Sequence, residues 1–487
     1  MNRAITQAWA ALGAEQGLLE RVSYDRVPGV LPARLPVREA ARATVAVCAL
    51  AAAELAAVRS GGPVPEVRVD DGAVATAFHS DRFVTMDGRA WDGFAPLSRF
   101  WRTADGWLRT HANYPHHEAA LLAALGLPAG SGPDAVADAL AGRGAADVEE
   151  AVYAAGGLAV AVRDAAAWAA SEQGSLVARR PLLTLERLGD APGPVREAGG
   201  ARDGAVREAG GARDGAGRDG GGARDGAPCL GAPCAGVRVL DLTRVLAGPV
   251  ATRTLALLGA DVLRVDAPGL PESQEAHNDT GLGKRSTLLD LGRAADRRAF
   301  GELLDAADVV VTGYRPGALD RFGLAPEALA ERRPGLVVAR LSAWGAYGPR
   351  GGRRGFDSLV QAATGIALLE GDGEKPGALP AQALDHGTGY LVAAAVLRAL
   401  TERHRGGGTW RVEAALTQTG HWLTHGTDPE PPVPGGGPYE PGRWLRERDT
   451  PLGRLRHALS PVRYEGGPAD WARPPGRWGA DAPRWTA

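Results

Sequence analysis

Short runs rich in β-branched residues alternate with amphipathic stretches through the second half of the chain. Continuous apolar runs of this length predict strands, and apolar positions that repeat every three to four residues predict helices. Strands joined through helices pair in parallel, which predicts an α/β fold with a parallel sheet covered by helices. The predicted strands span residues 237–242, 261–266, 308–311 and 336–341, and the predicted helices span 250–258 and 294–306.

The first half of the chain is rich in alanine and mostly helical in its pattern. It contains a faint echo of the second half, because residues 36–69 follow the same order of apolar helix, Gly-rich turn and strand as residues 380–413. In that alignment Ala41 stands opposite Asp385. Two interpretations remain open: the first half is a degenerate copy that has lost a carboxylate, or two alanine-rich helices resemble each other by composition.

A low-complexity segment separates the two halves. Residues 195–205 and 206–216 are the same eleven residues, and a decayed copy follows them. Such a Gly-rich, charged segment has too few apolar side chains to build a core, so it is typical of a linker. We therefore divide the chain into residues 1–190, a linker at 191–235, a main domain at 236–425 and a Pro/Gly-rich C-terminal segment at 426–487.

The charges of the chain nearly cancel, with 55 lysines and arginines against 57 aspartates and glutamates. Without a broad excess of either sign, we expect neither nucleic acid nor a membrane surface as a partner. Three cysteines are too few for a disulfide framework. We find no signal peptide and no run of roughly 18 apolar residues. The sequence therefore predicts a cytoplasmic protein.

Two groups of residues are weak candidates for a metal site. Cys229 and Cys234 lie in the low-complexity region, and His111, His116 and His117 lie at a predicted helix start. Histidines in that setting are more often surface residues than ligands. We expect no metal.

Asp385 is the leading candidate for a catalytic group. It stands in the Gly-rich segment 384–389, which leads directly into an apolar run. A lone carboxylate in such a turn is reachable, and Gly387 and Gly389 allow another group to approach the backbone closely. The alternative is that Asp385 only caps the helix that follows it.

Three further segments are candidates for binding an anion. The loop 243–249 lies between a strand and a helix, where free N–H groups favour a phosphate, although it lacks the Gly-x-Gly-x-x-Gly pattern of a dinucleotide site. Lys284 and Arg285 form a second cationic spot, for which a solvated charge pair is the alternative. Arg315 and Arg321 follow a predicted parallel strand, at the edge where α/β folds bind their ligands.

Together these segments closely resemble the family III CoA-transferases, the group that contains formyl-CoA and carnitine CoA-transferases. The resemblance spans about 236–425 and is carried by six ordered motifs. They are residues 236–249, 258–262, 284–286, 315–321, 355–362 and 384–389.

The resemblance implies a Rossmann-like CoA domain with a smaller α+β domain. It implies that Asp385 is the catalytic aspartate, that acyl-CoA and a carboxylic acid are the substrates, and that the protein is an interlocked homodimer without a permanently bound cofactor. A carboxylate is a sufficient nucleophile toward a thioester, through an aspartyl mixed anhydride and an aspartyl-CoA thioester. The expected CoA-binding residues are Arg244, Leu246, Ala247, Lys284, Arg285, Arg315, Arg321, Arg354 and Phe356.

Two other functions compete with CoA transfer. The same superfamily includes α-methylacyl-CoA racemases, in which a histidine stands at the position of Phe356. Phe356 cannot transfer a proton, and His386 is the remaining imidazole for that role. A CoA-binding protein without turnover is the third interpretation, because Gly313 and Leu246 replace polar residues of the family pattern.

The usual family member also carries its small domain as an insertion after the strand near Trp410. Here we expect the first half of the chain to supply that domain, beginning near residues 101–108 and leaving near 181–185.

Overall fold

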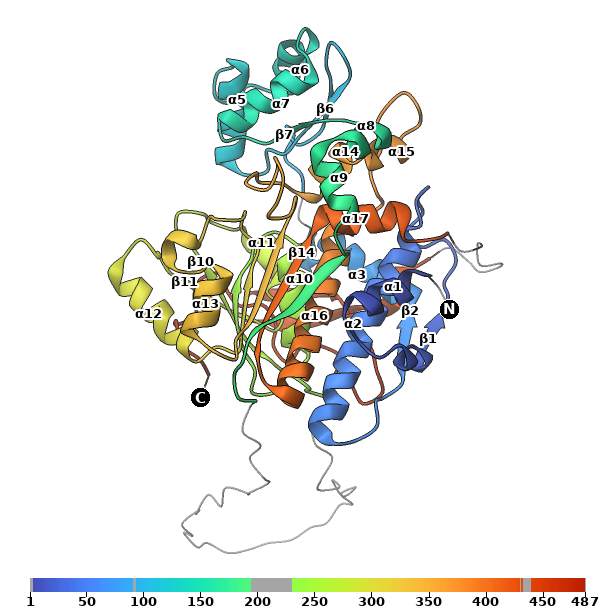
Figure 1. Cartoon of the computed structure of the whole chain (residues 1–487). Coiled ribbons are helices and arrows are strands. Elements are labelled where there is room, and N and C mark those ends of the chain that lie inside the picture. Colours follow the sequence, from blue (N-terminus) through green and yellow to red (C-terminus); the bar gives the residue numbers. More distant parts are fainter. Residues whose placement is uncertain (1–2, 91–92, 194–229, 430, 432–438, 487) are drawn as a thin grey trace, which may run out of the picture.

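The computed structural model describes residues 3–90, 93–193, 230–429, 431 and 439–486 (Figure 1). The repeated segment 195–216 lies outside the described residues. A seven-stranded sheet forms the centre of the molecule, in the order β11-β10-β9-β12-β13-β14-β8. Its strands are β9 (Arg238–Leu242), β10 (Asp261–Asp266), β11 (Arg285–Leu288), β12 (Val309–Thr312), β13 (Val337–Ser342), β14 (Thr409–Ala415) and β8 (Leu183–Gly189).

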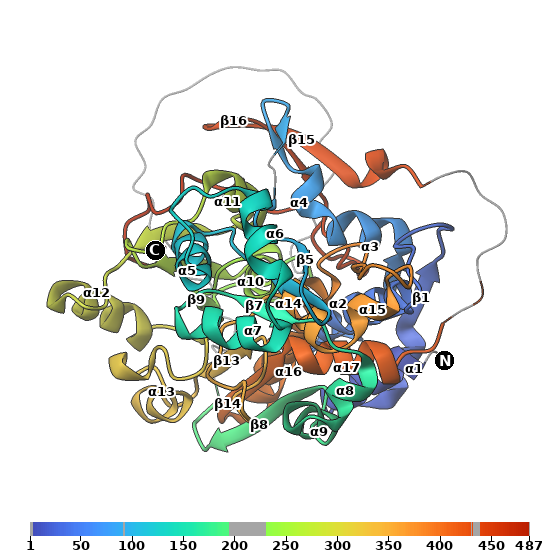
Figure 2. The same cartoon turned by 90° about the horizontal axis from the view of Figure 1, so that it is seen from above.

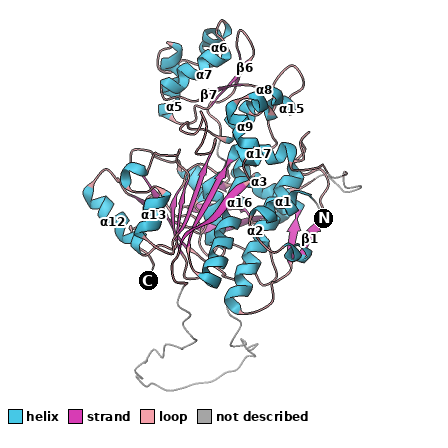
Figure 3. Cartoon of the chain, viewed as in Figure 1, coloured by secondary structure: helices cyan, strands magenta, loops and turns pink. Residues whose placement is uncertain are grey.

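Six strands of this sheet run parallel, and only the edge strand β8 pairs antiparallel, with β14. The sequence of β12 fits a parallel arrangement, because residues 309–311 are three fully buried valines. Such a continuous apolar run is typical of a parallel strand that is covered on both faces. Helices lie on both sides of the sheet (Figure 3). The helical elements of this half of the chain are α10 (Ala247–Leu257), α11 (Gln274–Thr280), α12 (Ala294–Asp305), η2 (Asp320–Phe322), α13 (Pro326–Arg332), α14 (Asp357–Ala363), α15 (Ile366–Leu369), α16 (Ala383–Gly406) and α17 (Leu416–His425).

The predicted mixed α/β fold with a parallel sheet is confirmed. The four predicted strands lie within one residue of β9, β10, β12 and β13, and residues 294–306 match α12 closely. The helix predicted at 250–258 begins earlier, at Ala247. Pro249 falls in its first turn, where the missing N–H of proline costs no helical hydrogen bond.

A smaller domain stands beyond one end of the sheet (Figure 1). Its three antiparallel strands pack against three helices around a separate core that includes Leu108, Leu121, Leu140 and Val148. It comes from the first half of the chain. Its elements are β5 (Phe100–Arg102), β6 (Trp107–Thr110), α5 (Pro115–Leu125), α6 (Pro133–Ala141), α7 (Ala145–Ala154) and β7 (Ala159–Ala161), and α8 (Ala165–Ala170) and α9 (Glu172–Ala178) lead on to β8.

The N-terminal residues form a short unit that packs beside α16. Helices α2 and α16 lie side by side in both views (Figures 1 and 2), and the buried ion pair Glu54–Arg398 joins them at 2.6 Å. Parallel strands β1 and β2 flank α2. The elements are α1 (Arg3–Ala11), η1 (Gln16–Arg21), β1 (Val22–Asp25), α2 (Val37–Ser60), β2 (Val67–Asp70), α3 (Asp71–Phe78), α4 (Ser80–Phe83), β3 (Thr85–Met86) and β4 (Arg89–Ala90).

By length and composition α2 could cross a membrane, contrary to the expectation that no segment is apolar enough. In the structure it is a core helix, because 94% of its most apolar stretch is buried against the rest of the protein. Its many alanines allow the close approach of α16.

The C-terminal segment contributes η3 (Pro441–Trp444), β15 (Leu445–Thr450) and β16 (Gly453–Ala458), which extend a four-stranded sheet with β3 and β4. The chain then crosses the main body. Trp471 Nε1 donates to the carbonyl oxygen of Arg253 at 2.7 Å, and Asp481 N donates to that of Ser286 at 2.7 Å. The segment therefore packs against the sheet and its helices.

Candidate active site

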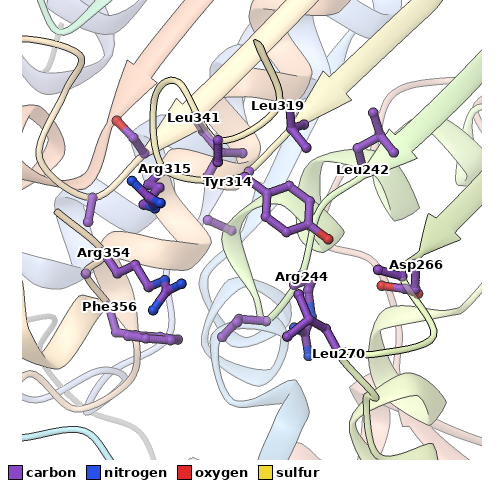
Figure 4. Close-up of a pocket in the computed structure, with 18 of the residues that line it drawn as sticks. Leu242, Arg244, Asp266, Leu270, Tyr314, Arg315, Leu319, Leu341, Arg354 and Phe356 are labelled. Atoms are coloured by element: carbon purple, nitrogen blue, oxygen red, sulfur yellow. The ribbon is translucent and has the colours of Figure 1, made fainter. Parts of the chain in front are cut away.

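A cavity of about 540 Å³ lies between the carboxyl ends of the parallel strands and the small domain. Leu242, Asp266, Gly313 and Ser342 mark the ends of four strands at its floor. Parallel sheets bind their ligands at this edge, because the loops that leave the strands converge there. Figure 4 shows Arg315 and Arg354 on one side, Tyr314 across the middle and Asp266 on the opposite side.

Asp385 lines this cavity from the first turn of α16. It lies inside the helix and not in a preceding turn, and it is only 7% exposed. Gly387 and Gly389 are helical as well, and a Cβ on Gly389 would stand 2.6 Å from the carbonyl oxygen of Ala247. The second glycine therefore permits α10 to lie close against α16.

Asp357 holds the start of α16. Its Oδ2 accepts hydrogen bonds from the backbone N–H groups of Leu384, at 2.9 Å, and Asp385, at 3.0 Å. Its other oxygen accepts from Gln361, whose own oxygen accepts from Leu379 N at 2.9 Å. Asp357 therefore caps the helix from outside, and the alternative that Asp385 serves only as the cap is not supported.

Burial raises the pKa values of both carboxyl groups. The pKa of Asp357 rises from its ordinary value of 3.8 to about 6. Burial and the neighbouring charge of Asp357 raise the pKa of Asp385 well above its ordinary value. A charge on Asp385 is thus poorly solvated, and a reaction that removes this charge is favoured.

Four predicted CoA-binding arginines line the cavity: Arg244, Arg315, Arg321 and Arg354. In the part of the chain that the structure describes, the guanidinium groups of Arg315 and Arg354 form no ion pair. Burial, and then the charge of Arg315, lower the pKa of Arg354. Cations that repel each other without a carboxylate between them are suited to an anionic ligand.

The loop between β9 and α10 brings Leu246 and Ala247 to the same cavity. Val245 in this loop has φ +68°, a conformation that costs a β-branched residue energy, and it is 37% exposed. Asp241 steadies the loop, because its Oδ1 accepts from Thr243 N at 3.0 Å.

Lys284 and Arg285 do not line the cavity. Lys284 is buried, and its Nζ donates to Asp241 at 2.9 Å and to Thr252 at 2.6 Å. Arg285 pairs with Asp261 at 2.8 Å. The structure thus gives them roles in bracing the sheet, because both charges already have carboxylate partners.

Phe356 lines the cavity beside the small domain. The ring of His111 stacks on it with centroids 3.6 Å apart. His117 also lines the cavity and is buried, so the expectation that these histidines lie at the surface is wrong for His111 and His117. Among the described residues, no group of three or more potential ligands is arranged to hold a metal.

His386 points away from this site. It is fully buried, is absent from the cavity lining and stacks on Phe78 with ring centroids 5.0 Å apart. Burial lowers its pKa well below the ordinary value. His386 is therefore in the wrong place to exchange a proton with a ligand of Asp385.

Sequence reasoning missed several residues of the site. Asp357 lies inside the motif 355–362. Its position directly after Phe356 is the feature of the sequence that could have indicated a role in the site. Tyr114 and His117 come from the small domain, 271 and 268 residues before Asp385 in the chain. Only the tertiary structure brings them to the cavity.

Part of the chain matches the model of a known protein family. Residues 234–443 match the model of CoA-transferase family III. An acetyl-coenzyme A transferase of Hypoxylon pulicicidum is 34% identical over 237 residues, which are 47% of this chain and 38% of that protein. A probable fatty acyl-CoA transferase of Mycobacterium tuberculosis is 37% identical over 201 residues, 38% of this chain and 50% of that protein.

The chain thus spans half or less of the length of these relatives. A solved structure of a CAIB/BAIF family protein from Brucella suis is 29% identical, with a TM-score of 0.37, and covers 41% of this chain and 60% of that one. Residues 234–443 of the chain are therefore similar to CoA-transferase family III.

Proposed function

We propose that the protein transfers CoA from an acyl-CoA to a carboxylic acid, with Asp385 as the nucleophile. The observation that carries the proposal is the position of Asp385, a poorly solvated carboxylate held by Asp357 in a cavity lined by arginines. Relatives support the reaction class, since one is a succinyl-CoA:mesaconate CoA-transferase of Haloarcula hispanica, 34% identical over 200 residues.

In the first half of the reaction, an oxygen of Asp385 attacks the thioester carbonyl of the donor. The C–S bond breaks, CoA leaves as a thiolate, and a mixed anhydride forms on Asp385. The thiolate then attacks the aspartyl carbonyl of the anhydride, which releases the donor acid and leaves an aspartyl-CoA thioester.

In the second half, the acceptor carboxylate attacks the aspartyl thioester carbonyl and releases the thiolate again. The thiolate attacks the acceptor's acyl carbonyl, and the new acyl-CoA and free Asp385 result. The ionised form of Asp385 is poorly solvated next to Asp357, which makes it a reactive nucleophile, and acylation consumes its charge.

We further propose that CoA lies across a Rossmann-like sheet. The six parallel strands follow the order of a doubly wound sheet, with a reversal between β9 and β12. Arg315, Arg321 and Arg354 would bind the phosphates, and Phe356 would border the thioester. A homodimer, a cytoplasmic location and the absence of a bound cofactor remain predictions from the family resemblance.

An isotope-exchange assay tests the proposal. The protein is incubated with succinyl-CoA and ¹³C-labelled succinate, and the label in succinyl-CoA is measured by mass spectrometry. We expect label to enter the thioester with the wild type and not with Asp385→Asn, which keeps the shape of the side chain. Tight binding of CoA without any exchange would instead support the CoA-binding protein without turnover.

A further inference from the structure

A second cavity, of about 370 Å³, lies apart from the cavity at Asp385. It opens between α1, the end of α9 and α17, and these three helices lie close together in both views (Figures 1 and 2). The two cavities share no lining residue among the described ones. Helix α17 reaches both, because Leu416 at its start lines the first cavity and Gln418 lines the second. A ligand of the second cavity would therefore be separate from a ligand of Asp385.

The indole N–H of Trp422 lacks an acceptor at this cavity. Trp422 lines the second cavity and is 5% exposed, and its Nε1 has no hydrogen-bond partner among the described residues. A Cβ on Gly426, another lining residue, would stand 2.4 Å from Cδ1 of Trp422, the carbon bonded to Nε1. The N–H edge of the ring therefore lies on the side of this cavity. Because a buried donor without an acceptor destabilises a protein, an acceptor supplied by a ligand would stabilise this one.

The titratable side chains around the second cavity favour an anion. They are Arg3 and Arg180, together with His421 and His425, whose rings stack one helical turn apart with centroids at 4.3 Å. None of the described aspartates and glutamates lines the cavity. Asp428 pairs with Arg3 at 3.4 Å, but both side chains are more than half exposed, and such a pair contributes little.

Arg180 is a cation held in place without a carboxylate. Its guanidinium lies 3.7 Å from the centre of the Tyr347 ring, and its Nη1 donates to the carbonyl oxygen of Leu176 at 3.2 Å. Among the described residues it forms no ion pair. A positioned guanidinium with donors to spare is suited to a carboxylate.

The remaining lining is largely apolar and limits the kind of anion. Ala11, Val177 and Leu182 border the cavity together with the ring of Trp422. A small-molecule site of this size typically combines apolar walls with a few polar groups that fix the orientation of the ligand. A phosphate dianion would lose its hydration against these walls and gain few donors in return. A single carboxylate on an aliphatic chain fits both parts of the lining.

We infer that the second cavity binds a carboxylic acid with an aliphatic chain. Trp422 Nε1 donates to the carboxylate, the two arginines offset its charge, and Val177 and Leu182 contact the chain. This inference goes beyond the proposed function and does not depend on it, because the second cavity lies outside the residues that surround Asp385.

Calorimetry on the full chain with saturating CoA tests the inference, since CoA occupies the cavity at Asp385 and does not react with a free acid. Octanoate and octan-1-ol have chains of equal length and differ in the carboxylate. We expect octanoate to bind at least roughly tenfold more tightly than octan-1-ol, the size of one hydrogen bond to a charged group. Inorganic phosphate should not displace octanoate.

Three variants connect this binding to the second cavity. Trp422→Phe keeps an aromatic ring without the N–H, so octanoate should bind roughly tenfold more weakly while octan-1-ol stays within about twofold. Arg180→Gln changes an exposed side chain and should weaken octanoate by about threefold even if Trp422→Phe does not fold. The control is Trp410→Phe, which removes an indole N–H that already donates to Gly407 at 3.1 Å outside the cavity, and it should leave octanoate binding unchanged.

Four results would overturn the inference. Loss of octanoate binding when CoA is saturating would place the acid in the cavity at Asp385, and equal binding of octan-1-ol would show an apolar cavity without a carboxylate site. Displacement of octanoate by phosphate would show an anion site that ignores the chain. Full affinity for octanoate in both Trp422→Phe and Arg180→Gln would place the acid elsewhere. Label exchange at Asp385 reports on the proposed function independently of all four.

Discussion

Helices α2 and α16 are built alike, yet only α16 opens onto the cavity. Each has 24 residues and leads through a turn into a strand and a further helix, although α14 and α15 separate α16 from the preceding strand β13. The residues before them, Pro36 and Gln382, have nearly the same backbone angles, φ −74° and −73°. The interpretation of the first half as a degenerate repeat stays a prediction.

The two units differ in what lies at the helix start. Counted from the first helical residue, Glu39 and not Ala41 takes the place of Asp385. Glu39 accepts a hydrogen bond from Arg38 Nε at 3.0 Å and is absent from the lining of the cavity. Among the described residues no cation pairs with Asp385, which lines the cavity.

The connection to the next helix also differs. In the N-terminal unit Arg42 pairs with Asp71 at 2.7 Å, a buried ion pair between α2 and α3. In the second unit the hydroxyls of Thr388 and Thr419 meet at 2.6 Å between α16 and α17. The N-terminal unit therefore packs its helices through buried ion pairs, whereas α16 presents a carboxylate to the cavity at the edge of the main sheet.

Substitution of the two matched carboxylates, Asp385 in α16 and Glu39 in α2, should give the largest difference in the rate of CoA transfer. We expect Asp385→Asn to lower the rate of CoA transfer on the order of 10⁴-fold or more, because the nucleophile is lost. Glu39→Gln, at the matched position of α2, should keep the rate within about threefold. Product formation followed by chromatography measures both, and equal losses would break the comparison.

Asp357→Ala should lower the rate by roughly 10- to 100-fold, because the start of α16 loses the acceptor for Leu384 N and Asp385 N. Asp357→Asn keeps an acceptor oxygen and should restore most of the loss. The split between kcat and KM is the useful measurement, since a displaced nucleophile lowers kcat. Unchanged kcat in Asp357→Ala would show that Asp357 is not needed for positioning.

The pair Asp357 and Asp385 should make stability depend on pH. Asp357 titrates at 3.8 when its pKa is ordinary and at about 6 in the fold, so the fold favours the protonated form. The contribution of Asp357 to the free energy of unfolding is complete below about pH 4 and is lost as pH rises through 6. The change amounts to about 3 kcal/mol. Urea unfolding of the wild type and of Asp357→Asn/Asp385→Asn should diverge over this range, and parallel pH profiles would contradict the expectation.

Ala41→Asp should show that a carboxylate alone does not make a site. Ala41 is 2% exposed and packs near Leu384 and Gly387 in a void of about 10 Å³. We expect the free energy of unfolding to fall by roughly 2–4 kcal/mol, because the new charge is buried without a partner. Chemical denaturation measures the loss, and a gain of a second acylated residue would refute the difference between the two units.

The sequence predicts the main sheet well and its electrostatics less well. Strand β10 was placed at its observed bounds, because a short buried strand between a helix and a turn leaves few alternatives. The sequence suggests that Lys284 binds a ligand. It does not reveal that Asp241, 43 residues away, is the carboxylate partner of this lysine. Asp385 and the four arginines lie in or next to ordered motifs of the sequence, and the structure brings them to one cavity. The expectation that His117 lies at the surface is wrong, because a histidine at a helix start does not show in the sequence what covers it.

Trapping of the acylated protein tests the central claim most directly. The wild type is incubated with succinyl-CoA alone and treated with hydroxylamine or borohydride, and its peptides are weighed by mass spectrometry. We predict one modified residue per chain, Asp385 at the start of α16, and no modification of the peptide that contains Glu39. An unmodified Asp385 in a protein that binds CoA tightly would contradict the account.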